Sequence, residues 1–106
     1  MAWVVLFFAG LFEIGWAIGL KYSDGFSKPV ASTATVIAMV VSVVLLGYAM
    51  KTLPVGTAYS VWVGIGAIGT VILGIWLFDE PAGLFRMVSV GLIIAGVIGL
   101  KLATTN

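Results

Sequence analysis

The sequence predicts an all-helical (all-α) integral membrane protein that crosses the bilayer four times. Of its 106 residues, 62% are hydrophobic and only 8% are charged, so a water-soluble fold of this size would expose much of its apolar surface. The apolar residues also gather into four stretches of roughly 20 residues, the length that a helix needs to cross about 30 Å of hydrocarbon. We therefore expect residues 1–106 to form one transmembrane domain.

Short polar connections separate the four apolar stretches. The stretches cover, in order, about residues 3–20, 30–50, 55–78 and 84–101. Pro29, Pro54 and Pro81 stand in the connections, where proline is compatible with the first turn of a helix. Connections this short make neighbouring helices antiparallel, so both termini are expected on one side of the membrane. The first stretch lacks the features of a cleaved secretory signal and is expected to remain in the mature protein.

Basic residues are distributed almost equally between the two sides of the membrane. Lys51 and Lys101 fall on the side of the termini, and Lys21, Lys28 and Arg86 fall on the other side. An excess of Lys and Arg normally sets orientation, so a chain without this bias is expected to insert both ways. Two opposite copies would form an antiparallel, dual-topology homodimer, equivalent to the inverted repeat of larger transporters. The alternative is that lipid or the insertion machinery fixes one orientation.

The composition argues against several functional classes. The chain has no cysteine and no histidine, which removes thiolate nucleophiles, imidazole bases and the usual zinc ligands. It has no basic cluster, which argues against nucleic acid as a partner. Gly64-Ile-Gly66-Ala-Ile-Gly69 matches a dinucleotide-binding fingerprint by letter, but it lies inside an apolar helical stretch instead of between a strand and a helix. We expect no enzyme activity, cofactor or metal.

Glu13 is the strongest functional signal in the sequence. It lies ten residues into the first stretch, about 15 Å deep by the rise of a helix and therefore near the bilayer midplane. A carboxylate there costs about 2.5–3.5 kcal/mol and is usually kept for function, although a protonated Glu that links helices is the alternative. A proton or a cation must neutralise the group. Competition between the two for Glu13 would make the protein an antiporter.

Aromatic and hydroxyl side chains accompany Glu13 in the expected helices. The set consists of Trp16 in the first helix, Ser42 in the second, and Tyr59 and Trp62 in the third. Aromatic faces and hydroxyls around a carboxylate suit an organic cation. The alternatives are an interfacial aromatic belt, to which we assign Trp3 and Trp76 near the ends of their helices, and a bond from Ser42 to its own helix.

Small residues recur in the third and fourth helices. Those in the third helix are Gly64, Gly66 and Gly69, and those in the fourth are Gly91, Ala95 and Gly99. The three glycines indicate either a hinge for alternating access or close helix packing. The regular spacing in the fourth helix indicates a contact between helices, either in a dimer or within one chain. We assign it to the dimer.

Two segments of the chain resemble the small multidrug resistance family. They are Glu13–Phe26 and Gly56–Ala67, and the resemblance extends along the whole chain. Trp16-Ala17, Lys21-Tyr22-Ser23 and Gly99-Leu100-Lys101 are similar to the branch of that family that exports guanidinium, whereas the multidrug branch typically has Gly-Thr at 16–17.

The resemblance implies an antiparallel homodimer that exchanges guanidinium for protons across the bacterial inner membrane. Glu13 of each subunit would bind proton or substrate, with Trp16, Ser42, Tyr59 and Trp62 lining or ordering the site. A planar guanidinium suits bidentate pairing with a carboxylate and stacking on aromatic rings. Two other functions stay open: a multidrug exporter of quaternary ammonium compounds, and a non-transporting membrane subunit that modulates a partner.

The chain departs from the guanidinium branch at two positions of the third helix. The branch usually has Ala and Thr where this chain has Ser60 and Val63. These positions lie one turn apart, so the hydroxyl is expected to have moved along the helix. The exchange would alter the hydrogen bonds that support Trp62 or Glu13 from behind and extend the substrate range to guanidinium with a short alkyl tail.

Overall fold

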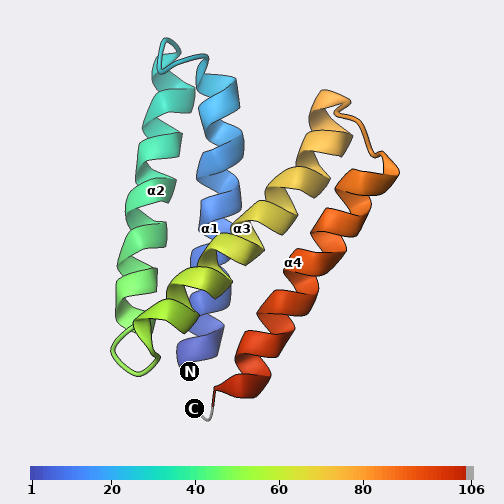
Figure 1. Ribbon diagram of the computed structural model, residues 1–106. Helices are drawn as coiled ribbons and strands as arrows, with labels where there is room; N and C mark the ends of the chain where they lie inside the picture. Colours follow the sequence, from blue (N-terminus) through green and yellow to red (C-terminus); the bar gives the residue numbers. More distant parts are fainter. Residues whose placement is uncertain (105–106) are drawn as a thin grey trace.

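The computed structural model describes residues 1–104 and confirms the predicted all-helical architecture (Figure 1). Its elements are α1 (Ala2–Ser23), α2 (Pro29–Ala49), α3 (Val55–Phe78) and α4 (Leu84–Ala103). Each of these helices is long and apolar enough to cross a membrane. In α3 the bounds coincide with the expected stretch, and α4 begins at the expected residue and ends two residues later. The bounds of α1 and α2 differ from the expected ones by one to three residues.

The connection between α1 and α2 explains why α1 continues past Leu20. The buried hydroxyl of Ser23 donates a hydrogen bond to the Leu20 carbonyl at 2.8 Å and accepts one from the Phe26 N–H at 3.2 Å. Asp24 and Gly25 then adopt positive φ angles of 50° and 71°, a conformation that ends a helix and that glycine adopts without strain. Pro29 opens α2 at its first turn.

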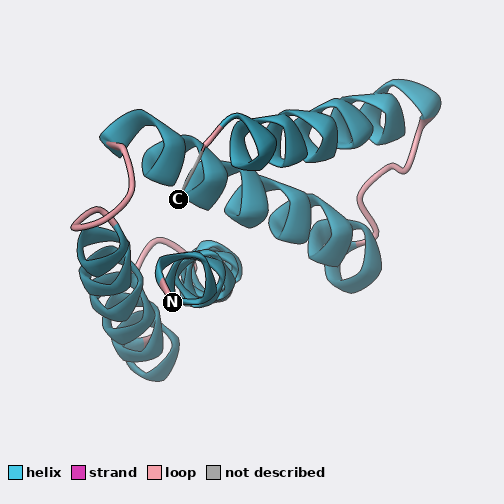
Figure 2. Cartoon of the chain, turned by 90° about the horizontal axis from the view of Figure 1, so that it is seen from below, coloured by secondary structure: helices cyan, strands magenta, loops and turns pink. Residues whose placement is uncertain are grey.

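The helices form a thin, open arrangement instead of a closed bundle. Neighbouring helices run antiparallel, α3 crosses α1 obliquely, and α4 lies beside α3, away from α2 (Figures 1 and 2). Both ends of the described chain lie at the same end of the molecule. The molecule measures 43 × 34 × 16 Å, so it is little more than one helix and its side chains deep in its thinnest direction.

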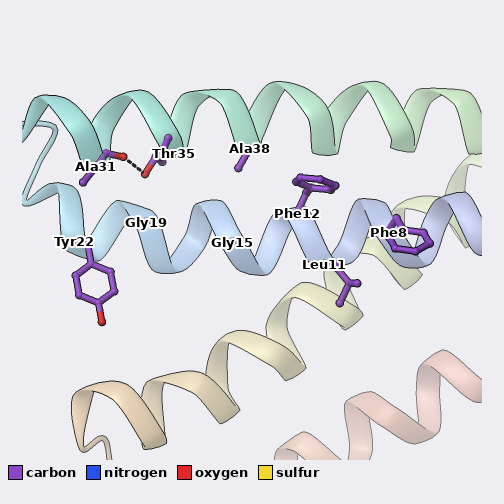
Figure 3. Close-up of a pocket in the computed structure, with 10 residues that line it drawn as sticks. Phe8, Leu11, Phe12, Gly15, Gly19, Tyr22, Ala31, Thr35 and Ala38 are labelled. Atoms are coloured by element: carbon purple, nitrogen blue, oxygen red, sulfur yellow. Dashed lines mark hydrogen bonds between the residues drawn. The ribbon is translucent and has the colours of Figure 1, made fainter.

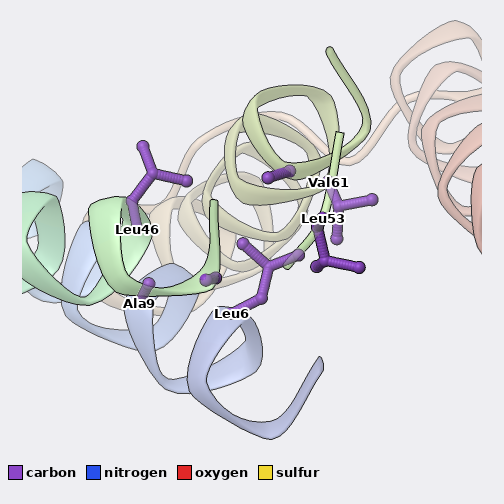
Figure 4. Packing of buried hydrophobic residues seen from close by; sticks show 7 residues of the cluster. Leu6, Ala9, Leu46, Leu53 and Val61 are labelled. Atoms are coloured by element: carbon purple, nitrogen blue, oxygen red, sulfur yellow. The ribbon is translucent and has the colours of Figure 1, made fainter. Parts of the chain in front are cut away.

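The buried core lies where α1, the end of α2 and the beginning of α3 meet (Figure 4). Its members are Leu6, Ala9, Leu46, Ala49, Leu53, Ala58 and Val61. Large apolar side chains elsewhere, such as Phe7, Val44 and Leu92, stay about half exposed or more. In lipid this exposure carries no hydrophobic penalty, and close packing holds the helices together. These surfaces are available to lipid and to other helices.

Candidate functional site

Glu13 projects from the middle of α1 onto the backbone of α3. Its carboxyl group lies against Gly66, so that a Cβ atom at Gly66 would collide with it. The Oε1 atom is buried and accepts no hydrogen bond from any residue that the structure describes. Buried polar atoms are nearly always paired, and an unpaired one costs about 1–3 kcal/mol. The carboxyl group therefore has an unused capacity to bind a proton or a cation.

Trp16 presents a second unpaired polar atom one turn further along α1. Its indole Nε1 is buried, and within residues 1–104 the structure gives it no acceptor. Residues three apart lie on the same face of a helix, so this donor and the Glu13 acceptor share one side of α1. One face of a single chain thus holds an unused donor and an unused acceptor. Both atoms are therefore available to pair with a further group.

Ser42 connects three helices through one hydroxyl group. Its Oγ donates a hydrogen bond to the backbone carbonyl of Ala9 in α1 at 2.7 Å and accepts one from Trp62 Nε1 in α3 at 2.9 Å. The side chain is fully buried. Ser42 thus bonds to other helices instead of its own. It orders Trp62, and its hydroxyl hydrogen is already committed to Ala9.

Tyr59 and Trp62, one turn apart on α3, form an aromatic pair. Their ring centroids lie 5.8 Å apart with the planes inclined by 46°. Tyr59 is 54% exposed, and Ser60 and Val63 are exposed as well. The hydroxyl that pairs with Trp62 belongs to Ser42 and not to Ser60. This part of α3 therefore presents an aromatic ring and a hydroxyl residue on a surface that the rest of the chain leaves uncovered.

The three glycines of α3 each face a close neighbour. A Cβ atom at Gly64 would collide with Val97 of α4, one at Gly66 with Glu13, and one at Gly69 with Ile14 of α1. The helix continues without interruption from Val55 to Phe78. These contacts favour the packing interpretation of the glycines. The hinge stays a prediction.

The small residues of α4 lie on the face directed away from α3. Gly91, Ala95 and Gly99 are exposed, whereas Val90 is buried and Val97 partly buried on the side that meets α3. The stripe is therefore unused for packing within the chain. Its assignment as a dimer contact stays a prediction, and the competing interpretation, packing within one chain, loses its support.

A large cavity lies elsewhere, between α1 and α2 (Figure 3). It has a volume of about 690 Å³ and is lined by Phe8, Leu11, Phe12, Gly15, Gly19, Tyr22, Ala31, Ala34, Thr35 and Ala38. On α1 these residues occupy the face opposite Glu13, by their helical spacing. The only hydrogen bond between residues drawn there runs from Thr35 Oγ1 to the Ala31 carbonyl of its own helix. An apolar cavity of this kind suits lipid chains and not a small cation.

Comparison with known proteins identifies the family to which this chain belongs. Residues 1–93 match the family model described as Small Multidrug Resistance protein. The chain belongs to the small multidrug resistance family. The resemblance noted in the sequence is thereby confirmed. With its four apolar helices, this member of the family is a multi-pass protein of the bacterial inner membrane.

Relatives within the small multidrug resistance family align along nearly all of the chain. A protein of Yersinia pseudotuberculosis named guanidinium exporter is 64% identical over 104 residues, which cover 98% of this chain and 100% of the relative. Proteins of the same name from Citrobacter freundii and Klebsiella oxytoca are each 58% identical over 104 residues, covering 98% of this chain and 99% of each relative. The name guanidinium exporter belongs to these relatives.

Two features of this family member are absent from the sequence-based analysis. The contact of Glu13 with Gly66 joins residues that are 53 positions apart, and nothing in the local pattern indicates it. The cavity between α1 and α2 has a weak signal, the small residues Gly15 and Gly19 facing Ala31 and Ala34. Trp16 lies on α1, Ser42 on α2, and Tyr59 and Trp62 on α3.

Proposed function

We propose that this chain exports guanidinium in exchange for protons, and that Glu13 binds the two in turn. The observation that carries the proposal is the buried carboxyl oxygen of Glu13, which accepts no hydrogen bond within residues 1–104. The relatives named guanidinium exporters, which match nearly the whole chain, indicate which cation it takes. An export function in these relatives also favours transport over catalysis.

Guanidinium fits the chemistry of the site. It is planar and delocalised, it carries only hydrogen-bond donors, and it pairs with a carboxylate through two parallel N–H donors. Indole N–H groups are donors as well, so they cannot bind it. Tryptophan contributes its ring face instead, through cation–π contact. Trp62 suits this role because Ser42 occupies its N–H and fixes the direction of its ring.

We further propose that the functional unit is an antiparallel homodimer whose subunits insert in opposite orientations. A slab 16 Å thick cannot enclose a path across the membrane. Tyr59 and Val63 lie on an uncovered surface of α3 and would meet the second copy across the substrate, while the stripe of Gly91, Ala95 and Gly99 supplies a second contact. The nearly equal count of basic residues on the two sides supports insertion both ways.

Exchange in proteoliposomes tests the function. Vesicles with an acidic interior should take up guanidinium as protons leave, and dissipation of the pH gradient should stop net uptake. Glu13→Gln should abolish this exchange. Glu80→Gln is the matched control, since Glu80 lies outside the spans in a partly exposed ion pair with Arg86 at 3.2 Å, and such pairs contribute little to stability. Equal activity of Glu13→Gln and wild type would refute the proposal.

The same assay separates the rival functions. Strong proton-driven uptake of a quaternary ammonium ion, with guanidinium ignored, would identify a multidrug exporter. No exchange of either cation by correctly folded wild-type protein would favour a subunit that modulates a partner. Uptake of guanidinium with a short alkyl tail would support the effect expected from Ser60 and Val63, which are exposed beside Tyr59.

A further inference from the structure

We propose that Gly66 is a positioning residue for Glu13: its bare backbone is the seat on which the carboxyl group rests. This inference rests on the proposed exchange of protons and guanidinium at Glu13. It assigns to Gly66 a role distinct from general helix packing and from a hinge. The role follows from which atoms meet at this one point of the α1–α3 contact.

The contact between α1 and α3 consists of side chains set against glycines. Ile65 of α3 lies against Gly10 of α1, and Ile14 of α1 lies against Gly69 of α3. Between these two apolar contacts, Glu13 lies against Gly66. A Cβ atom at Gly66 would stand 2.7 Å from Glu13 Cγ and nearer still to the carboxyl carbon and Oε1. A substitution at Gly66 therefore displaces the end of the acidic side chain.

No hydrogen bond within the described chain holds Oε1 in place, so packing against Gly66 is what fixes it. Other charges are distant: α2 and α3 contain no charged residue, and α1 contains only Lys21, two turns further along the helix. Tyr59 of α3 and Tyr48 of α2 are the remaining titratable groups on these two helices, and both side chains are more than half exposed. Packing against Gly66, more than any nearby charge, therefore determines the position of the Glu13 carboxyl group.

The position of the Glu13 carboxyl group matters because, in the proposed exchange, the proton and guanidinium bind to the same oxygen atoms. Displacement of a reacting group by about 1 Å can lower activity by a factor on the order of 100. A methyl group at Gly66 would displace the carboxyl group from the backbone of α3. The geometry of guanidinium pairing and the access of protons would both change.

Gly66→Ala and Gly69→Ala form a matched pair for the test. Each adds one methyl group to the same helix interface, but the first meets a carboxyl group and the second an isoleucine. In proteoliposomes, we expect Gly66→Ala to lower guanidinium exchange by a factor on the order of 100 and to change its pH profile. Gly69→Ala should keep the wild-type pH profile. Equal losses with unchanged pH profiles in both variants would overturn the proposal.

Shortening the acid provides a second measurement that does not depend on transport. Glu13→Asp withdraws the carboxyl group by one methylene and should relieve the clash with Ala at position 66. If Gly66→Ala unfolds on heating at a lower temperature or fails to fold, adding Glu13→Asp should restore stability, whereas it should not rescue Gly69→Ala. If Glu13→Asp rescued both Gly66→Ala and Gly69→Ala, or neither of them, the proposed role of Gly66 would be contradicted. Wild-type protein without guanidinium exchange would refute the proposed function and leave this stability result standing.

Discussion

Trp62 of α3 donates its indole N–H to the hydroxyl of Ser42 in α2, at 2.9 Å, and that hydroxyl donates in turn to the Ala9 carbonyl of α1. One oxygen atom thus joins three helices and sets the orientation of an aromatic ring. Ala9 lies one turn before Glu13 on the same face of α1. The ring that would stack on the substrate is therefore held in register with the acid that would pair with it.

Replacing Ser42 by alanine should weaken both the fold and transport. The change leaves the Trp62 N–H and the Ala9 carbonyl without their partner, and interhelical hydrogen bonds in membranes contribute about 0.6–1.7 kcal/mol. We expect a lower thermal unfolding temperature in detergent and slower guanidinium exchange. Ser89→Ala is the control, because Ser89 is exposed and, among residues 1–104, hydrogen-bonds only to the Phe85 carbonyl of its own helix. Equal behaviour of the two variants would show that the bridge is dispensable.

Guanidinium binding should weaken as the pH falls. If one proton leaves Glu13 for each guanidinium that binds, the apparent Kd should rise by up to about tenfold for each pH unit below the titration of the acid. Above that range the Kd should become constant. Calorimetric titration of purified protein at a series of pH values measures this directly. A Kd that does not change with pH would rule out competition at Glu13.

A bulky residue in the α4 stripe should separate the subunits. Gly91 faces open space in the single chain, so Gly91→Leu leaves the fold of the monomer intact while obstructing a close helix contact. We expect self-association in detergent to weaken about tenfold or more, a change of about 1.4 kcal/mol. Gly96→Leu provides the comparison, since Gly96 is also exposed in open space but lies to the side of the stripe. Light scattering coupled to gel filtration reports the result.

The ammonium group of Lys101 lies 4.5 Å from the centroid of the Trp3 ring and links the end of α4 to the start of α1. Lys101→Met should lower stability by about 0.5–1 kcal/mol, the usual value of an exposed cation–π contact. Lys51→Met removes the similar contact with Tyr48, which joins residues only three positions apart. A larger loss at position 101 than at 51, measured by thermal unfolding, would show that the link between distant helices matters.

The sequence predicts the elements of this fold better than it predicts their contacts. Stretches of apolar residues bounded by proline and charge indicate four helices, and the depth of Glu13 follows from helix rise alone. In a helix that is apolar on every side, however, periodicity does not show which face meets a neighbour. The contact of Glu13 with Gly66 depends on how α3 crosses α1, and the hydrogen bond from Ser42 to Ala9 depends on how α2 packs against α1. No local pattern in the sequence records either arrangement.

The short connections between the helices leave almost no protein in water. The three connections, residues 24–28, 50–54 and 79–83, contain five residues each and offer only a small surface to a soluble binder. A blocking compound that binds outside the substrate site would have to partition into the bilayer and compete with lipid for the broad apolar faces of the helices. Screens that select for aqueous solubility alone would discard such compounds at the first step.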